Sequence, residues 1–472
     1  MFRLSDLQAH NSENDCWIAI HGNVYDVKFE NITKFLHIHP GGKAILLQHA
    51  GSDATPAFAD VHPAELLDEY LSSDETLGTL DPEFASAITG DSLSSRSANP
   101  APPLHTILSL SEMENLALKR LSQKAVSYYA SGTDDERTKF ANETIFKSIL
   151  LRPRIFIDCT NCSLEASVLG TTVGLPIFIS PAAMAKLAHP SGEAGIASAC
   201  SSFNTLQIIS KNASISVSDI VAAGPNAVFA WQLYVLKDLR ATERTLAQIK
   251  KIRQIKFIVL TLDAPFPGKR EADERFKAAE AMAQTSTPPV WGTDAGLTWT
   301  KTLPWLRKHT DLPIILKGIQ THEDAYLAAQ HPEVSGVILS NHGGRALDTA
   351  PTAIQVLMEI RRFCPQVLEE IEVFVDGGVK RGTDVVKALA LGARGVGIGR
   401  AALYGLAVGG SAGVLRTLKI LADEVATAMR LLGVERVDQL GLHHINTTAL
   451  NRLLYDGPLG LGEINSGMRG KL

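Results

Sequence analysis

Short apolar runs alternate with longer amphipathic stretches over most of the chain after residue 170. Runs of this length are typical of buried β-strands, and apolar positions three or four residues apart are typical of helices. Strands and helices that alternate in this way predict an α/β architecture, a (β/α)8 barrel. The predicted strands are residues 176–180, 205–210, 228–234, 257–263, 313–317, 336–341, 372–376 and 395–399.

The chain before the barrel strands changes character along its length. Its first part holds two short predicted strands around His21-Gly22-Asn23 and a helix-like run at 43–50. A Ser-, Ala- and Pro-rich stretch follows; it cannot bury much apolar surface and predicts a flexible linker, although a passive spacer has the same composition. Helical periodicity then runs over 111–130. The predicted multidomain organisation is a small α+β domain at 1–80, a linker at 81–105 and the barrel domain at 106–472.

Polar side chains stand at the carboxyl ends of the predicted strands. Barrel active sites gather at this end, so these residues predict one site. In the run 339–345, His342 is of the residue type that can serve as a base in catalysis, and Arg345 offers a planar fork suited to a carboxylate. Residues 271–297 lack clear periodicity and predict a mobile loop over the site. The strand-end residues are Ser180, Ser210, Gln232, Tyr234, Thr261, Asp263, Lys317, His342, Asp376 and Arg400.

Glycines and cations follow the last two predicted strands, at Asp376-Gly377-Gly378-Val379-Lys380 and Gly397-Ile398-Gly399-Arg400. Glycine-rich backbone with cations at this place predicts a phosphate site of the barrel type. A dinucleotide fingerprint does not fit, because the strand–helix–strand context and the following acid are wrong.

Two histidines in the first part have the setting of haem ligands. His39 lies in His-Pro-Gly-Gly, where the turn presents it at a fixed angle, and His62 follows 23 residues later. Two neutral imidazoles on either side of an apolar slot are what a six-coordinate haem iron requires. The histidines that compete for these roles are His10, His21, His37 and His49.

Composition narrows the class of protein. No apolar run reaches the roughly 20 residues that a membrane span needs, and the first residues lack a leader pattern. We therefore expect a cytoplasmic protein; a mitochondrial intermembrane space location, if a leader has been removed, and a peroxisomal one, from Gly470-Lys471-Leu472, are alternatives. The five scattered cysteines predict free thiols, with Cys159 and Cys162 as a weak metal or redox pair.

Charge is distributed unevenly. Residues 1–80 carry 4 Lys and Arg against 12 Asp and Glu, a net charge of −8, while the rest of the chain carries +3. An acidic first domain suits a basic protein partner, although a solvated acidic surface has the same composition. Nothing in the charge pattern indicates nucleic-acid binding.

Residues 17–78 resemble a cytochrome b5-type domain. The resemblance rests on the His-Pro-Gly-Gly motif, on Val24-Tyr25-Asp26-Val27, on 51–55 and on Leu77-Gly78. It implies haem b, held by His39 and His62. The sequence departs from the usual Gly-His-Ser near the second ligand, because His62 lies between Val61 and Pro63.

Residues 110–440 resemble the FMN-dependent 2-hydroxy-acid oxidase and dehydrogenase family. The supporting runs are Tyr128 to Gly132, Gln232 to Val235, Thr261 to Pro265, Lys317-Gly318, Ser340 to Arg345 and Asp376 to Gly382. A haem domain joined to such a barrel resembles the fungal flavocytochrome L-lactate dehydrogenases. This likeness implies FMN and haem b as cofactors, a basic acceptor such as cytochrome c, and a homotetramer.

The resemblance also implies a role for each site residue. His342 takes a proton from the substrate and Asp263 orients its imidazole. The substrate is held by Tyr128, Tyr234, Arg270 and Arg345. FMN is held by Ala182, Ser210, Gln232, Thr261, Lys317, Asp376, Gly377, Gly378, Lys380, Gly399 and Arg400.

Four departures from the family pattern bear on these roles. Ala182 stands where Thr is frequent, Lys380 where Arg is common, and the run Gly399-Arg400-Ala401 lacks a common Pro. Asn212 lies where relatives place a bulky apolar residue near the substrate side chain. A polar residue there is expected to change the preference among substrates.

The expected reaction is oxidation of an L-2-hydroxy acid, L-lactate to pyruvate, with electrons passing from FMN through haem to the acceptor. The alternatives are an oxidase that uses oxygen, and an enzyme for another hydroxy acid such as glycolate, mandelate or a longer chain. A third interpretation is a haem-carrying electron-transfer or binding module on a barrel that only stores flavin. The presence of His342, Asp263 and Arg345 argues against it. Hydride and carbanion routes both stay open.

Overall fold

The computed structural model describes residues 1–12, 15–26, 43–59, 61–63, 66–67, 76–81, 102–280 and 293–456. The predicted haem ligand His39 lies outside these residues, as does most of the predicted linker 81–105. The cysteine prediction is confirmed, because all five thiols are free. Among the described residues, no group of three or more His, Cys, Asp or Glu side chains has a geometry that could hold a metal ion, so Cys159 and Cys162 do not form part of one.

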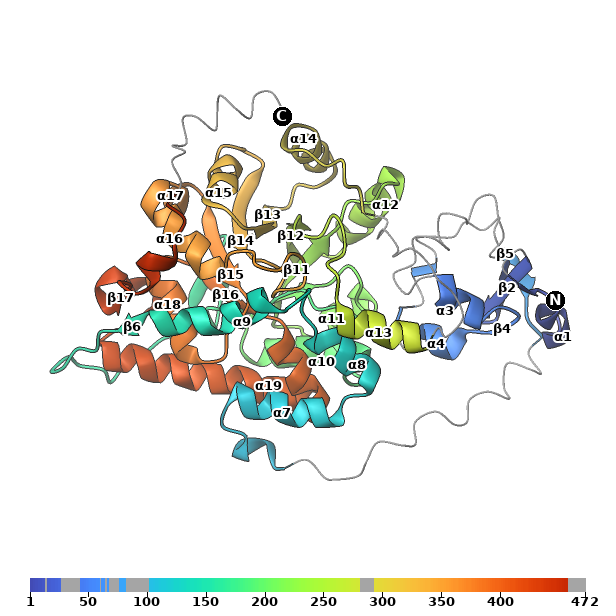
Figure 1. Cartoon of the computed structure of the whole chain (residues 1–472), viewed down its shortest axis with the longest axis horizontal. Helices are drawn as coiled ribbons and strands as arrows, with labels where there is room; N and C mark the ends of the chain where they lie inside the picture. The colour runs from blue at the N-terminus through green and yellow to red at the C-terminus, as the bar shows by residue number, and fades with distance from the viewer. Residues whose placement is uncertain are drawn as a thin grey trace.

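A five-stranded sheet organises the first domain, the blue part of the chain in Figure 1. The strands pair in the order β1-β2-β3-β5, and β4 pairs with β2. His21 and Gly22 both have positive φ between β2 and β3, which confirms the turn predicted there. The elements are α1 (Leu4–Gln8), β1 (Asn11–Ser12), β2 (Asp15–Ile20), β3 (Asn23–Asp26), α3 (Lys43–Gln48), β4 (Ser52–Asp53), α4 (Thr55–Ala59) and β5 (Thr76–Thr79).

Eight parallel strands close into a barrel in the order β9 to β16, with β16 paired to β9. Every predicted barrel strand is present, so the predicted (β/α)8 TIM barrel is confirmed. The strands are β9 (Ile177–Ile179), β10 (Leu206–Ile209), β11 (Val228–Leu233), β12 (Ile255–Thr261), β13 (Ile314–Ile319), β14 (Val334–Leu339), β15 (Glu372–Asp376) and β16 (Gly395–Ile398).

Both faces of the barrel strands are buried, which explains why they appear in the sequence as continuous apolar runs. One set of alternate side chains fills the interior, including Phe178, Ile208, Phe257 and Phe374. A short hairpin of β7 (Ala166–Val168) and β8 (Thr171–Val173) adds Val168 and Val173 to that interior cluster.

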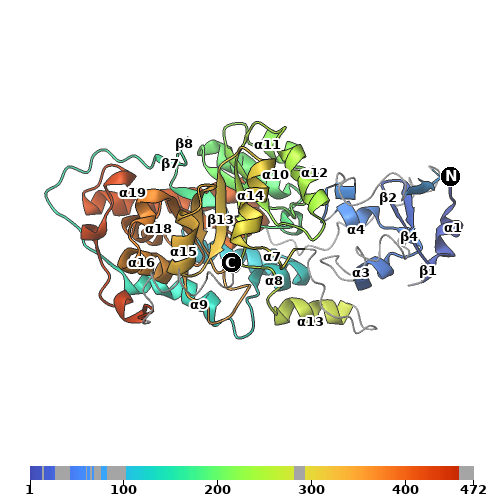
Figure 2. The same ribbon diagram turned by 90° about the horizontal axis from the view of Figure 1, so that it is seen from above.

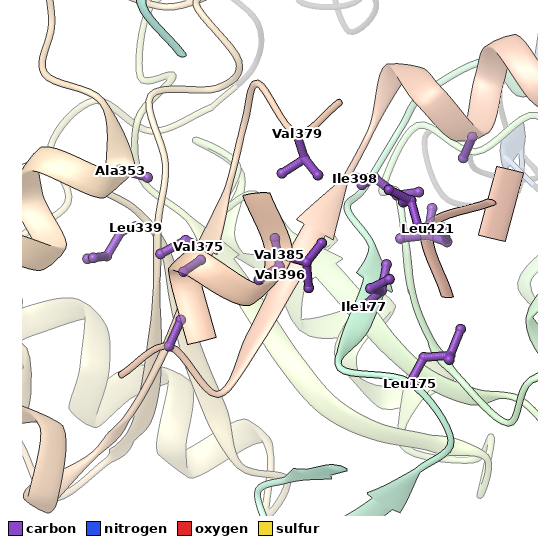
Figure 3. Close-up of a cluster of buried hydrophobic side chains, with 14 of the residues drawn as sticks. Leu175, Ile177, Leu339, Ala353, Val375, Val379, Val385, Val396, Ile398 and Leu421 are labelled. Carbon is purple, nitrogen blue, oxygen red and sulfur yellow. The ribbon is translucent and has the colours of Figure 1, made fainter. Parts of the chain in front are cut away.

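The other set of strand side chains packs against the surrounding helices. Figure 3 shows Ile177, Val396 and Ile398 from the strands near Val385 and Leu421 from the helices. The helices are α10 (Gly192–Ser202), α11 (Val217–Ala223), α12 (Leu239–Ile249), α13 (Glu271–Glu280), α14 (Trp299–His309), α15 (His322–Ala329), α16 (Ala353–Phe363), α17 (Val367–Glu370), α18 (Gly382–Ala390) and α19 (Arg400–Leu432).

In the part of the chain that the structure describes, one helix, α19, is long and apolar enough to cross a membrane by length and composition alone. Its non-helical backbone at Gly409 and Gly410 divides it, and many of its side chains, including Leu418 and Leu421, are fully buried. Packing against α7, α10 and α18 accounts for its apolar character.

Two predictions about local structure are wrong. The helix expected over 111–130 is two helices, α7 (Leu110–Arg120) and α8 (Gln123–Ala130), because Leu121 is extended and the Ser122 side chain accepts a hydrogen bond from the Ala125 amide at 3.2 Å. The loop expected over 271–297 begins instead with the helix α13, while 281–292 lies outside the described residues.

Several short elements complete the second domain. They are η2 (Leu104–Thr106), α9 (Arg137–Thr144), η3 (Ile145–Ser148), β6 (Leu150–Leu151), η4 (Ala185–Leu187), η5 (Val437–Gln439), η6 (Leu442–His444), β17 (Ile445–Asn446) and η7 (Leu450–Leu453). Of these, α9 and η4 matter most for function, because they lie beside the loops that leave the carboxyl ends of the barrel strands.

Candidate active site

A cavity opens where the barrel strands end. Two residues of the predicted site lie behind its wall, Asp263 and Thr261, and Arg270 lines a second cavity that shares Tyr128, Tyr234 and His342 with the first. The predicted residues that line the first cavity are Tyr128, Ala182, Ser210, Gln232, Tyr234, Lys317, His342, Arg345, Asp376, Gly377, Gly378, Lys380, Gly399 and Arg400.

His342 and Asp263 form a hydrogen-bonded pair from two different strand ends. The imidazole Nδ1 lies 2.8 Å from Asp263 Oδ1; the carboxylate is fully buried, whereas His342 faces the cavity. Burial alone would raise the pKa of Asp263, but the charges of His342 and Lys317 lower it overall. The ionised carboxylate only accepts hydrogen bonds, so Nδ1–H donates to Asp263 and the opposite ring nitrogen, Nε2, is left free of this pair.

Gly318 makes room for this pair. A Cβ built on Gly318 would lie 2.6 Å from Asp263 Cβ and Cγ, and the residue has φ +100. Both the space and the backbone conformation therefore require glycine at this position.

We expect Gly318→Ala to lower kcat by at least about tenfold, because Asp263 must move away from His342 and misplacement of catalytic groups by about 1 Å is costly. Steady-state kinetics with the expected kind of substrate, an L-2-hydroxy acid, measures the loss of kcat. Gly170→Ala is the control, because Gly170 also has positive φ but a Cβ there meets no atom within 4 Å. A kcat equal to that of the control variant would contradict the prediction.

Lys317 is buried between two carboxylates. Its ammonium lies 3.4 Å from Asp376 Oδ2 and donates to Ser340 Oγ at 2.8 Å. Burial disfavours its charge, but Asp376 and Asp263 outweigh that effect and raise its pKa. A permanent cation therefore stands in the cavity wall, where it can stabilise an anionic ring system.

Two guanidinium groups converge on Tyr128. The Cζ atoms of Arg270 and Arg345 each lie 5.2 Å from the centroid of its ring. Arg270 is paired with Asp273 at 3.2 Å, whereas Arg345, among the residues that the structure describes, donates to the carbonyl oxygens of Tyr129 and Ser131 and pairs with no carboxylate. Burial, together with the charge of Arg270, lowers the pKa of Arg345. The negative charge of a bound carboxylate would offset the cost of burying Arg345 and the repulsion between the two guanidinium groups. Arg270 and Arg345 therefore make an anion site.

A chain of hydrogen bonds crosses the floor of the cavity. Ser210 Oγ donates to Gln232 Oε1 at 3.1 Å, and Gln232 Nε2 donates to Thr261 Oγ1 at 3.1 Å. Ser210 and Gln232 reach the cavity surface, while Thr261 supports Gln232 from behind. The hydrogen-bonded side chains are therefore held at fixed positions, as binding of a planar heterocycle requires.

The part of the cavity that is predicted to hold the phosphate, near Lys380 and Arg400, contains more carboxylates than the strand-end residues predict. Lys380 forms ion pairs with Glu114 and with Glu143, the latter at 3.3 Å, so its charge is already balanced. Arg400 lacks a carboxylate partner among the described residues and donates to the Gly343 carbonyl at 2.8 Å. Arg400 also begins the long helix α19, whose amino end favours an anion.

The glycines at this end serve different purposes. A Cβ on Gly399 would meet no atom within 4 Å, so this glycine leaves open space for a ligand. A Cβ on Gly378 would lie 2.0 Å from the Asn142 carbonyl oxygen, so Gly378 is needed for packing against α9. Gly378 also lines the cavity, so its backbone stays available for the cofactor role predicted for it.

The described residues fit FMN, and they include one of the two predicted haem ligands. A cavity with a buried lysine, a polar floor, an open glycine and an arginine at a helix start suits FMN. In the first domain, His62 is half-buried beside Phe58, with ring centroids 5.1 Å apart, and desolvation of the imidazole lowers its pKa to about 4. The imidazole is therefore neutral at pH 7, as a metal ligand must be.

Sequence reasoning missed several residues of the cavity wall. Glu114, Glu143 and Tyr404 line it near Lys380, and they come from α7, α9 and α19 rather than from strand ends. Glu193 was also missed, although it is the single charged residue of the otherwise small and apolar helix α10. A lone carboxylate in such a helix is the signal that could have identified it.

Two protein-family models match the chain. The model described as FMN-dependent dehydrogenase matches residues 117–447, and the model described as cytochrome b5-like heme/steroid binding domain matches residues 3–81.

Curated relatives match the chain over different extents. The L-lactate dehydrogenase (cytochrome) of Saccharomyces cerevisiae is 37% identical and covers 92% of this chain and 78% of its own length. The protein of the same name from Wickerhamomyces anomalus is 35% identical and covers 94% of this chain and 79% of its own length. The glycolate oxidase of Spinacia oleracea is 39% identical but covers only 75% of this chain, with 97% of its own length.

Solved structures are similar to the barrel domain. A double mutant of flavocytochrome b2 with pyruvate bound has a TM-score of 0.69 at 37% identity, over 77% of this chain and 92% of that one. A mandelate oxidase variant with 2-hydroxy-phenylacetamide has a TM-score of 0.64 at 33% identity, over 72% of this chain and 98% of that one.

Proposed function

This chain belongs to the FMN-dependent dehydrogenase family and carries a cytochrome b5-like haem domain, and on that premise we propose that it oxidises L-lactate to pyruvate and passes the electrons through haem to a protein acceptor. The observation that carries the proposal is the His342–Asp263 pair, which faces the same cavity as the anion site of Arg345 and Tyr128. A base beside a carboxylate clamp is the arrangement that oxidation of a 2-hydroxy acid needs.

The side chains divide the work of the reaction. Arg345 and Arg270 bind the substrate carboxylate, and Tyr128 and Tyr234 offer hydroxyl groups to its oxygens. Conversion of a 2-hydroxy acid to a 2-keto acid removes two protons and two electrons. FMN, when bound, would accept the two electrons. His342 receives a proton at Nε2, and Asp263 stabilises the imidazolium that results. Lys317 offsets negative charge that gathers in the cavity.

The choice of substrate and acceptor rests on the relatives. The two L-lactate dehydrogenases span both domains of this chain, whereas the glycolate oxidases match only about three quarters of it. The acidic first domain suits a basic acceptor such as cytochrome c. The proposal includes a homotetramer, which light scattering on the purified protein would measure.

An absorption experiment tests the proposed function. The purified protein is recorded anaerobically before and after addition of L-lactate, and we expect the flavin band to bleach and the reduced haem bands to sharpen. If the cofactor bands do not change with L-lactate but change with glycolate or mandelate, that acid is the substrate. The first residue to examine would then be Asn212, which lines the cavity. Peroxide formation in air without haem reduction would favour the oxidase reading instead.

A further inference from the structure

A lysine of the barrel domain contacts the haem domain. Lys186, in η4, donates a hydrogen bond from Nζ to the carbonyl oxygen of Ala59 at 3.0 Å. Ala59 ends α4, three residues before His62. Figures 1 and 2 both show α4 on the side of its domain that faces the barrel. The contact therefore connects the barrel with the segment that carries the described haem-ligand candidate.

Charge favours the same face. The haem domain is acidic, with a net charge of −8 over residues 1–80, and the barrel presents Lys186 toward it. Lys124, on α8, also lies near the haem domain, because its charge adds to burial in lowering the pKa of His49. Cations on one body that meet an acidic body fix the register of docking.

The barrel side of this contact is held by one buried carboxylate. Glu193 is 1% exposed; its Oε1 accepts from the amides of Ala185 and Ser214 at 2.9 and 3.0 Å, and its Oε2 accepts from Ser214 Oγ at 2.8 Å. The amide of Lys186 then donates to Ser214 Oγ at 3.0 Å. The backbone of η4 is thus fixed to the loop after β10 through Glu193 and Ser214.

The same loops form part of the cavity wall. Met184 donates from its amide to the Asn212 carbonyl at 3.1 Å, and Ala182 and Asn212 line the cavity. Hydrogen bonds from Met184, Ala185 and Lys186 therefore tie the backbone that carries the Lys186 side chain to the loop after β10, and both loops contribute to the cavity wall. A buried carboxylate without such partners would be costly, which argues that these hydrogen bonds act as a unit.

We propose that Lys186 and Glu193 form a seat for the haem domain: Lys186 contacts the end of α4, and Glu193 is the positioning residue that holds the loop carrying Lys186. The inference deepens the proposed function and rests on its passage of electrons to haem. The seat fixes the haem-domain segment that contains His62 beside the loop that walls the cavity.

The first test replaces Lys186 with Met, which keeps the length of the side chain and removes the donor. In anaerobic stopped-flow mixing of the holoprotein with L-lactate, we expect the rate of flavin reduction to stay within about twofold of wild type and the rate of haem reduction to fall about tenfold, the loss typical of a charged hydrogen bond. Hydrogen exchange of the oxidised holoprotein, without substrate, should become faster in the peptide 54–63. Lys419→Met is the control, since this exposed lysine pairs with Asp423 on α19.

Each outcome decides the proposal. Unchanged haem reduction with unchanged exchange in 54–63 would overturn it, and so would an equal loss in flavin reduction, which would assign Lys186 to the cavity. If L-lactate reduces no flavin in the wild type, the proposed function fails, while the exchange comparison still decides the seat.

The second test separates the positioning role of Glu193 from folding alone. Glu193→Gln keeps an acceptor for the Ala185 and Ser214 amides, so we expect exchange in 54–63 and in 181–188 close to wild type. Glu193→Ala removes both acceptor oxygens and the three hydrogen bonds they accept, and both peptides should exchange faster. Faster exchange in 181–188 with wild-type exchange in 54–63 would show that Glu193 does not support the seat.

Discussion

Replacing His342 with Gln is expected to slow reduction of the flavin by L-lactate by about 10²- to 10⁴-fold, the range that general acid–base groups contribute. The amide keeps the shape of the side chain and can still bond Asp263, but it has no lone pair that accepts a proton at neutral pH. Stopped-flow absorbance of the flavin measures the rate directly. The FMN content should stay at the wild-type level, because none of the residues assigned to cofactor binding is changed.

A second histidine provides the matched control for this experiment. His309 also lies near a carboxylate, with Nε2 3.4 Å from Glu243 Oε1, but it is in α14 and does not line the cavity. We expect His309→Gln to leave flavin reduction unchanged. A rate for His342→Gln within threefold of the control would remove His342 from the catalytic assignment.

Replacing Arg345 with Lys is expected to lower kcat/KM for L-lactate about 10²-fold, mainly through KM. In the wild type one guanidinium nitrogen already donates to the Tyr129 and Ser131 carbonyls, which leaves the rest of the fork for the substrate. A lysine ammonium cannot keep those bonds and bind the carboxylate in the same geometry. Two charged hydrogen bonds, at roughly 1.5 kcal/mol each, amount to about two decades in affinity.

The control for the arginine experiment is Arg361→Lys. Arg361 is also partly buried and donates to a backbone carbonyl, that of Leu391 at 3.0 Å, but it belongs to α16 outside the cavity. Its variant should keep the wild-type KM. If the KM of Arg345→Lys rises less than threefold, the carboxylate is held elsewhere, and Arg270 becomes the first alternative.

The barrel could be predicted from the sequence because its strands are buried on both faces. Such strands must be apolar throughout, and a polar residue directly after one of them stands out. Asp263 and His342 were recognised in this way, each a few residues beyond the end of β12 or β14. The two residues come together because parallel strands end at the same rim.

Other features depend on contacts that no local pattern encodes. The Lys380 ammonium, which the sequence assigns to the cofactor, also pairs with Glu114, 266 residues away in sequence, and no local pattern predicts that pair. The break between α7 and α8 arises from a serine cap, and serine is also tolerated within helices. The Lys186 contact with Ala59 joins two domains across the predicted linker, where sequence periodicity carries no information.

Closure of the barrel also sets the order in which the protein can form during synthesis. The first barrel strand, β9, needs β16 as its second neighbour, with Phe178 opposite Gly397. At about 5–20 residues per second, one edge of β9 stays unpaired on the ribosome for tens of seconds. The haem domain has no such delay, since Phe2 already bridges Leu80. Nascent chains should therefore carry a finished haem domain ahead of an aggregation-prone half barrel, and their yield should depend on chaperones that protect exposed strand edges.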